Sequence, residues 1–172
     1  MARCRANGGF NSRKKKEITM GTGLIAQFKD LGAILVLGLA ASGSALGAGI
    51  AGMSAIGAWK KNFSQNKPPS FMLVVFTAAP LTQTVYGMIV MRQLMEIANK
   101  GQYLWGVGAF AGLAIGLSAF WQGKCAAVAC DAMGETNKGF GNYLVVLGMT
   151  ETVALLVMAF TLMLLGIISG GA

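Results

Sequence analysis

Four long apolar stretches dominate the pattern of hydrophobic and polar positions along the chain. They run over Leu31–Ala58, Ser70–Ile97, Tyr103–Cys130 and Tyr143–Ser169, with short polar segments between them. Each stretch exceeds the roughly 20 apolar residues that a helix needs to cross a bilayer. We therefore predict an all-α membrane protein with four transmembrane helices, arranged as two tandem helical hairpins.

The composition agrees with a chain that lies almost wholly in a membrane. Of its 172 residues, 55% are hydrophobic and only 12% are charged, and there is no histidine. A soluble domain normally carries about twice that share of charged residues. The polar segments are too short to hold a water-soluble catalytic domain. We therefore expect the chain to have no enzymatic activity by itself.

The net charge of +8 is concentrated in residues 1–19. From Met20 onward the chain has eight Lys and Arg residues against five acidic ones. A basic tail of this kind suits anionic lipid or nucleic acid. We favour the plainer interpretations, a disordered tail or a chain that starts at Met20, and we expect no nucleic-acid partner.

The charges of the connections indicate how the chain lies in the membrane. The first connection carries Lys60, Lys61 and Lys67 and no acidic residue. Cytoplasmic loops of membrane proteins carry an excess of Lys and Arg. We therefore predict a multi-pass protein of the cell membrane whose first and third connections are cytoplasmic and whose termini lie outside.

The two halves of the chain are similar in sequence. Two pairs of segments match, GLAASGSALGAG (38–49) with GLAIGLSAFWQG (112–123), and LTQTVYG (81–87) with MTETVAL (149–155). In the second pair Gln83 is matched by Glu151. We infer a duplicated hairpin, with the first copy at 20–98 and the second at 99–172, in which only the second copy carries the acidic residue.

Small residues crowd the first apolar stretch. Gly47–Gly52 reads GAGIAG and matches the GxGxxG pattern of nucleotide sites, but that fingerprint requires a preceding strand. Gly43 and Gly47 instead stand one helical turn apart, and small residues at this spacing let membrane helices approach closely. We expect close helix packing in a crowded ring of many copies.

Glu151 is the main indication of function. A carboxylate within the bilayer costs on the order of 3 kcal/mol, and the cost falls if the group is protonated or binds a cation. In the second stretch, Ala79, Thr82, Gln83 and Tyr86 share one helical face. Pro80 interrupts the backbone hydrogen bonds beside them and frees a carbonyl oxygen.

Gln122 in the third stretch completes the set. It lies about nine residues before the third connection, and Glu151 lies about nine residues after it. Both are therefore expected at a depth of roughly 13 Å from the same face of the membrane. We expect Lys124 to extend toward the cytoplasmic interface. The alternative is an ion pair between Lys124 and Glu151, which would neutralise the carboxylate permanently.

These groups form a shell of oxygen ligands with one negative charge. The shell consists of Glu151, Gln122, Gln83, Thr82 and one main-chain oxygen. Hard cations prefer oxygen ligands, and a single charge is neutralised by a monovalent ion. We therefore predict a Na⁺ site, with H⁺ as the alternative, and expect Tyr86 to donate its hydroxyl proton to Glu151.

The chain resembles the duplicated proteolipid, called subunit K, of V-type rotary ATPases, and most of all the bacterial sodium-pumping branch. The resemblance rests on the tandem hairpin, the glycine-rich first helix, the P-x-TQ-x-x-Y segment at 80–86, Gln122 and the TET of 150–152. It implies that the carbonyl of Ala79 is the main-chain ligand. The chain departs from the family at Leu81, where glycine is frequent.

The resemblance also implies the assembly. Identical copies would form a ring in the membrane, turned by a soluble motor through central-stalk subunits. A stator membrane subunit with an essential arginine would open each site. The proton-carrying rotor is the nearest alternative, and a small four-helix secondary transporter or channel subunit is a more distant one.

Overall fold

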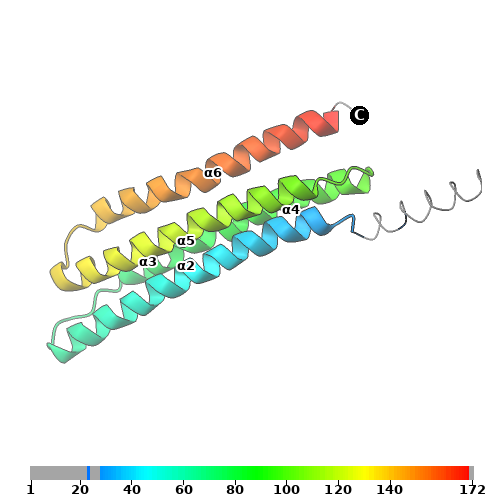
Figure 1. Ribbon diagram of the computed structural model, residues 1–172. Helices are drawn as coiled ribbons and strands as arrows, with labels where there is room; N and C mark the ends of the chain where they lie inside the picture. The colour runs from blue at the N-terminus through cyan, green and yellow to red at the C-terminus, as the bar shows by residue number, and fades with distance from the viewer. Residues whose placement is uncertain (1–22, 24–27, 171–172) are drawn as a thin grey trace, which may run out of the picture.

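The computed structural model describes Gly23 and residues 28–170, which form two helical hairpins (Figure 1). The elements are α2 (Leu31–Ser64), α3 (Leu73–Ala78), the 3₁₀ turn η1 (Ala79–Leu81), α4 (Thr82–Asn99), α5 (Trp105–Thr136) and α6 (Phe140–Gly170). No strand occurs in this described part of the chain. The predicted all-α fold is confirmed, whereas the basic tail at 1–19 lies outside the described residues.

Four helical segments are long and apolar enough to cross a membrane. They are α2, α5, α6 and a segment from Leu73 to Asn99 in which η1 interrupts the helix. Two of the helices continue past the predicted apolar stretches, since α2 ends at Ser64 and α5 at Thr136. Loss of hydrophobicity does not end a helix when the residues that follow still favour one.

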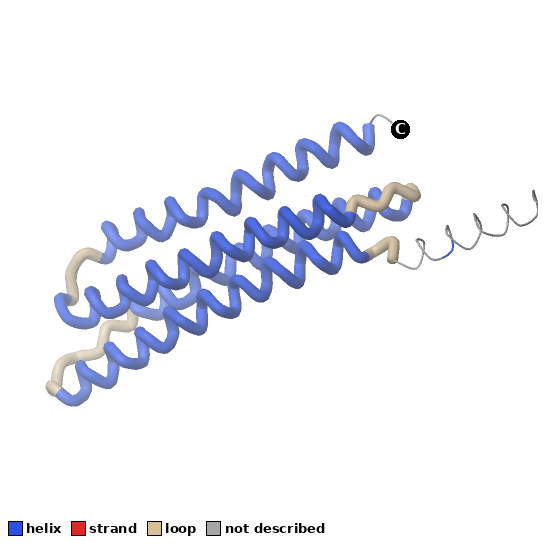
Figure 2. Tube along the Cα trace, viewed as in Figure 1, coloured by secondary structure: helices blue, strands red, loops and turns tan. Residues whose placement is uncertain are grey.

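The helices lie side by side, and consecutive membrane-spanning segments run in opposite directions (Figure 2). The first connection, before α3, and the third, before α6, lie at one end of the bundle. The second connection lies at the opposite end with the start of α2 and the end of α6. This arrangement agrees with the predicted pairing of the connections. Which end faces the cytoplasm stays a prediction.

The closest packing joins α2 to α5, which are the first helices of the two hairpins. A Cβ atom on Gly43 would lie 2.0 Å from the carbonyl oxygen of Gly116, and one on Gly123 would lie 2.2 Å from the Cα of Gly47. Distances this short leave no room for any side chain. The predicted role of the small residues in close helix packing is confirmed for this pair.

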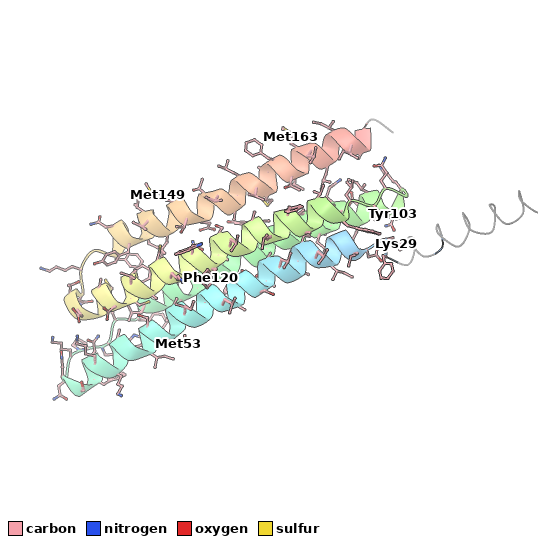
Figure 3. The ribbon with its side chains drawn as sticks, in the orientation of Figure 1. Lys29, Met53, Tyr103, Phe120, Met149 and Met163 are labelled. Carbon is pink, nitrogen blue, oxygen red and sulfur yellow. The ribbon has the colours of Figure 1, made fainter. Side chains whose placement is uncertain are left out.

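Helix α6 is far less buried than the other three membrane-spanning segments. α6 is the most apolar of the four and the least buried. Its Met149 and Met163 project away from the bundle, with 68% and 61% of their surface exposed (Figure 3). Its buried side chains are Leu147, Ala154 and Leu165. Most of α6 therefore presents a surface suited to lipid or to another apolar surface.

Specific contacts stabilise the end of the bundle that holds the first and third connections. The indole N–H of Trp59 donates to the carbonyl oxygen of Ser70 at 2.8 Å. Lys61 forms an ion pair with Glu135 across α2 and α5. Gly139 has φ +87°, a conformation open to glycine, and this lets the third connection turn sharply into α6.

A candidate cation site around Glu151

Pro80 shapes one wall of the site. A proline lacks the backbone N–H that a helix needs, and here the chain forms the short 3₁₀ turn η1 between α3 and α4. The carbonyl oxygen of Ala79 lies 3.0 Å from Oγ1 of Thr82. Leu81, the residue that departs from the family pattern, is 51% exposed, so its larger side chain is accommodated at the surface.

Oxygen atoms crowd around the hydroxyl of Thr82. Its Oγ1 lies 3.0 Å from the Ala79 carbonyl oxygen, 3.2 Å from Oε1 of Gln83 and 2.8 Å from Oε1 of Glu151. A hydroxyl carries one proton and donates one hydrogen bond. The hydroxyl can therefore donate to only one of these three oxygens. The carbonyl and amide oxygens carry no proton of their own, so at least one of them faces the hydroxyl oxygen without a hydrogen bond between them.

The carboxylate of Glu151 is held by groups from two other helices. Tyr86, on α4, donates its hydroxyl proton to Oε1 at 2.6 Å. Gln122, on α5, places its Nε2 at 3.3 Å from Oε2. Together with Thr82, these residues link α4, α5 and α6 through a single acidic side chain.

A pair of buried amides lies behind the carboxylate. Gln83 and Gln122 are fully buried, and Nε2 of Gln83 donates to Oε1 of Gln122 at 2.6 Å. Nε2 of Gln122 also donates to the carbonyl oxygen of Leu147 on α6 at 3.0 Å. The orientation of the Gln122 amide is thus defined on both sides, with its oxygen toward Gln83 and its nitrogen toward α6.

The structure brings the predicted site residues together. Ala79, Thr82, Gln83, Tyr86, Gln122 and Glu151 are joined by the contacts above. Pro80 packs against α2, since a Cβ on Gly47 would lie 3.1 Å from its ring. Binding of Na⁺ by this set stays a prediction.

The alternative ion pair between Lys124 and Glu151 is not observed. The Nζ atom of Lys124 instead lies 4.7 Å and 4.6 Å from the ring centroids of Phe120 and Trp121. Cations are attracted to the faces of aromatic rings. Within the described residues, the ion pair found is the one between Lys61 and Glu135. The carboxylate of Glu151 therefore forms no ion pair with a basic side chain in the described part of the chain.

One residue beside the site was not predicted. Ser118 donates its hydroxyl proton to the carbonyl oxygen of Thr150 at 2.6 Å, and Thr150 directly precedes Glu151. Ser118 stands one helical turn before Gln122, so the face-sharing argument applied to α4 places it on the same face of α5 but does not predict its hydrogen bond to α6.

Comparison with known proteins agrees with this arrangement. The family model of the ATP synthase C subunit matches residues 105–164, which hold α5 and most of α6. The A-type ATP synthase subunit K of Methanocaldococcus jannaschii is 35% identical over 146 residues, or 83% of this chain. The chain belongs to the proteolipid family of the V- and A-type ATPases. The match spans 64% of the relative's length, so this proteolipid corresponds to less than two thirds of it.

Proposed function

We propose that this proteolipid is a rotor-ring subunit of a V- or A-type rotary ATPase and that it carries Na⁺ across the membrane on Glu151. Its own part is to hold and release a cation, and nucleotide chemistry belongs to other subunits. The proposal is supported by the family, by the four apolar helical segments and by the polar cluster at Glu151.

The crowding of oxygens at Thr82 is the observation that carries the choice of Na⁺. A proton on the carboxyl group would need a single acceptor. Here a main-chain carbonyl oxygen, an amide oxygen and a carboxylate oxygen all lie within 3.2 Å of the hydroxyl oxygen of Thr82. Oxygen ligands with one negative charge suit a hard monovalent cation.

The amide of Gln122 has two roles in this proposal, one in the empty site and one in the loaded site. Its Nε2 now faces the carboxylate, so an amide N–H stabilises the negative charge of Glu151. A half-turn of the amide would bring Oε1 to the same place and supply a ligand to the ion, with loss of the hydrogen bonds to Gln83 and to Leu147. Loading would therefore replace an amide donor by a cation, and unloading would restore the donor.

The partners follow from the same proposal. Further copies would cover the exposed apolar surfaces of the helices and close a ring. Glu151 lies on α6, the least buried helix, where a stator subunit with an arginine could reach it. The end that carries Lys61 and Glu135 would contact the central stalk. These assignments rest on the family and on the position of α6.

Carbodiimide modification of the purified protein tests the proposal, because the reagent couples to carboxyl groups within membranes. We expect modification of Glu151, suppressed by millimolar Na⁺ and not by K⁺ at the same concentration. The variant E151Q should not be modified at this position. The variant Q122L should still be modified, but its protection should require at least about tenfold more Na⁺, the loss of one good ligand.

A matched control is available on α4. Gln93 lies outside the polar cluster on the same helix as Gln83, so Q93L makes the same chemical change away from the site. It should behave as the wild type. Modification that Na⁺ never suppresses would instead favour the proton-carrying rotor. Protection that is unchanged in Q122L would remove Gln122 from the ligand set.

A further inference from the structure

Two side chains of α5 hold the backbone of α6 beside Glu151. Ser118 donates to the carbonyl oxygen of Thr150 at 2.6 Å, and Gln122 donates to that of Leu147 at 3.0 Å. Ser118 and Gln122 are one helical turn apart, and their two acceptors are one turn apart on α6. The pair therefore sets how α6 is placed along α5 at the level of the carboxylate.

Apart from the contacts of Glu151 itself, two buried side chains hold this part of α6. The buried side chains nearest to Glu151 are Leu147 and Ala154, and the neighbouring Met149 is exposed. Leu147 packs in the core, but Ala154 is small and the exposed side chains bury little surface, so the backbone-directed hydrogen bonds add to the positioning here.

Only one of the two hydrogen bonds to α6 is kept when the ion binds. Under the function proposed above, the Gln122 amide turns when the ion is bound and its bond to Leu147 is lost. The Leu147 carbonyl then still accepts from Oγ1 of Thr150, at 2.8 Å in the structure. Ser118 has no ligand role, so its bond to Thr150 is retained in both states.

We propose that Ser118 is a positioning residue for Glu151, which keeps the Thr150–Glu151 backbone in place while Gln122 exchanges its bond to α6 for the ion. This inference rests on the proposed function. Ser118 acts through the backbone of α6 and touches no ion, so its loss should weaken ion binding without removing a ligand.

The duplicated sequence supplies a matched control. Ser44 is the counterpart of Ser118 in the first hairpin and is just as buried, with 1% of its surface exposed against 8%. Within the described residues, its hydroxyl has no hydrogen-bond partner. In the first hairpin η1 directly precedes Thr82, the counterpart of Thr150, whereas α6 passes through Thr150 without a break. S44A therefore removes a serine hydroxyl that forms no hydrogen bond in the described residues.

The test compares wild type, S118A, S118T and S44A by carbodiimide modification of Glu151. We expect S118A to need about threefold more Na⁺ for half-protection, the effect of an average hydrogen bond between membrane helices. Without Na⁺, S118A should be modified faster, because α6 is less firmly held. S118T, which keeps the hydroxyl, and S44A should match the wild type in both measurements.

The two measurements separate this inference from the proposed function. If Na⁺ fails to protect the wild type, sodium transport is refuted, and the modification rate without Na⁺ still decides the role of Ser118. The inference is overturned if S118A equals the wild type in both measurements, if S44A changes as much as S118A, or if S118T behaves as S118A. Should S118A fail to fold, S118C, which keeps the volume and weakens the donor, takes its place.

Discussion

A methyl group added at Gly43 tests the packing of α2 against α5 directly. The new Cβ would lie 2.0 Å from the carbonyl oxygen of Gly116, whereas ordinary contact begins at 3.4 Å, so the helices must part by about 1.4 Å. The obstacle is a backbone atom that no rotamer change can move. Overpacking costs about 1–3 kcal/mol, and replacing a helical glycine by alanine returns about 0.5–1 kcal/mol. We expect G43A to lose about 1–2 kcal/mol of unfolding free energy.

The matched control for this change lies on the same helix. A Cβ on Gly49 would have no atom within 4 Å in the described residues, so G49A should gain up to about 1 kcal/mol. Circular dichroism during unfolding by SDS in mixed micelles measures both variants. G43A should unfold at a lower SDS fraction than the wild type, and G49A at an equal or higher one. If G43A proves as stable as G49A, the close approach of the two backbones is wrong.

Two further predictions concern polar pairs. Q83L leaves Oε1 of the buried Gln122 without its donor and should cost about 1–3 kcal/mol in the same SDS unfolding. The double variant Q83L/Q122L should cost less than the sum of the single changes, and strict additivity would contradict the amide pair. Lys61 and Glu135 are half exposed, at 48% and 52%, so a double-mutant cycle of K61A and E135A should give coupling that salt abolishes. Coupling that persists in molar salt would show that the pair is shielded from water.

The sequence was sufficient to predict the four helices, because apolar runs of bilayer length have one structural solution in lipid. It did not predict where α2 and α5 end. Hydropathy reports where the apolar stretch ends, whereas the helices continue to Ser64 and Thr136 through segments that contain charged residues. The ion pair between Lys61 and Glu135 joins these extensions, and no local pattern indicates it.

The polar cluster could be predicted because polar side chains are rare in these helices and share faces at helical spacing. The hydrogen bond of Ser118 could not be predicted in the same way. A serine in a membrane helix often bonds to its own helix, as Ser42 does to the carbonyl of Gly38 at 2.7 Å. Spacing alone does not distinguish this from the bond of Ser118 to α6, nor does it set which way the Gln122 amide faces.

The glycine contact between α2 and α5 has a consequence for access to the carboxylate. These two backbones are in direct contact and cannot slide past each other without collision. The acidic side chain instead belongs to α6, which packs against α5 and α4. Under the proposed function, a displacement of α6 would uncover Glu151 and leave the contact between α2 and α5 unchanged. Under the proposed function, loading and release of the ion would therefore involve only the contacts of α6, while the surface that α2 and α5 form together keeps its shape.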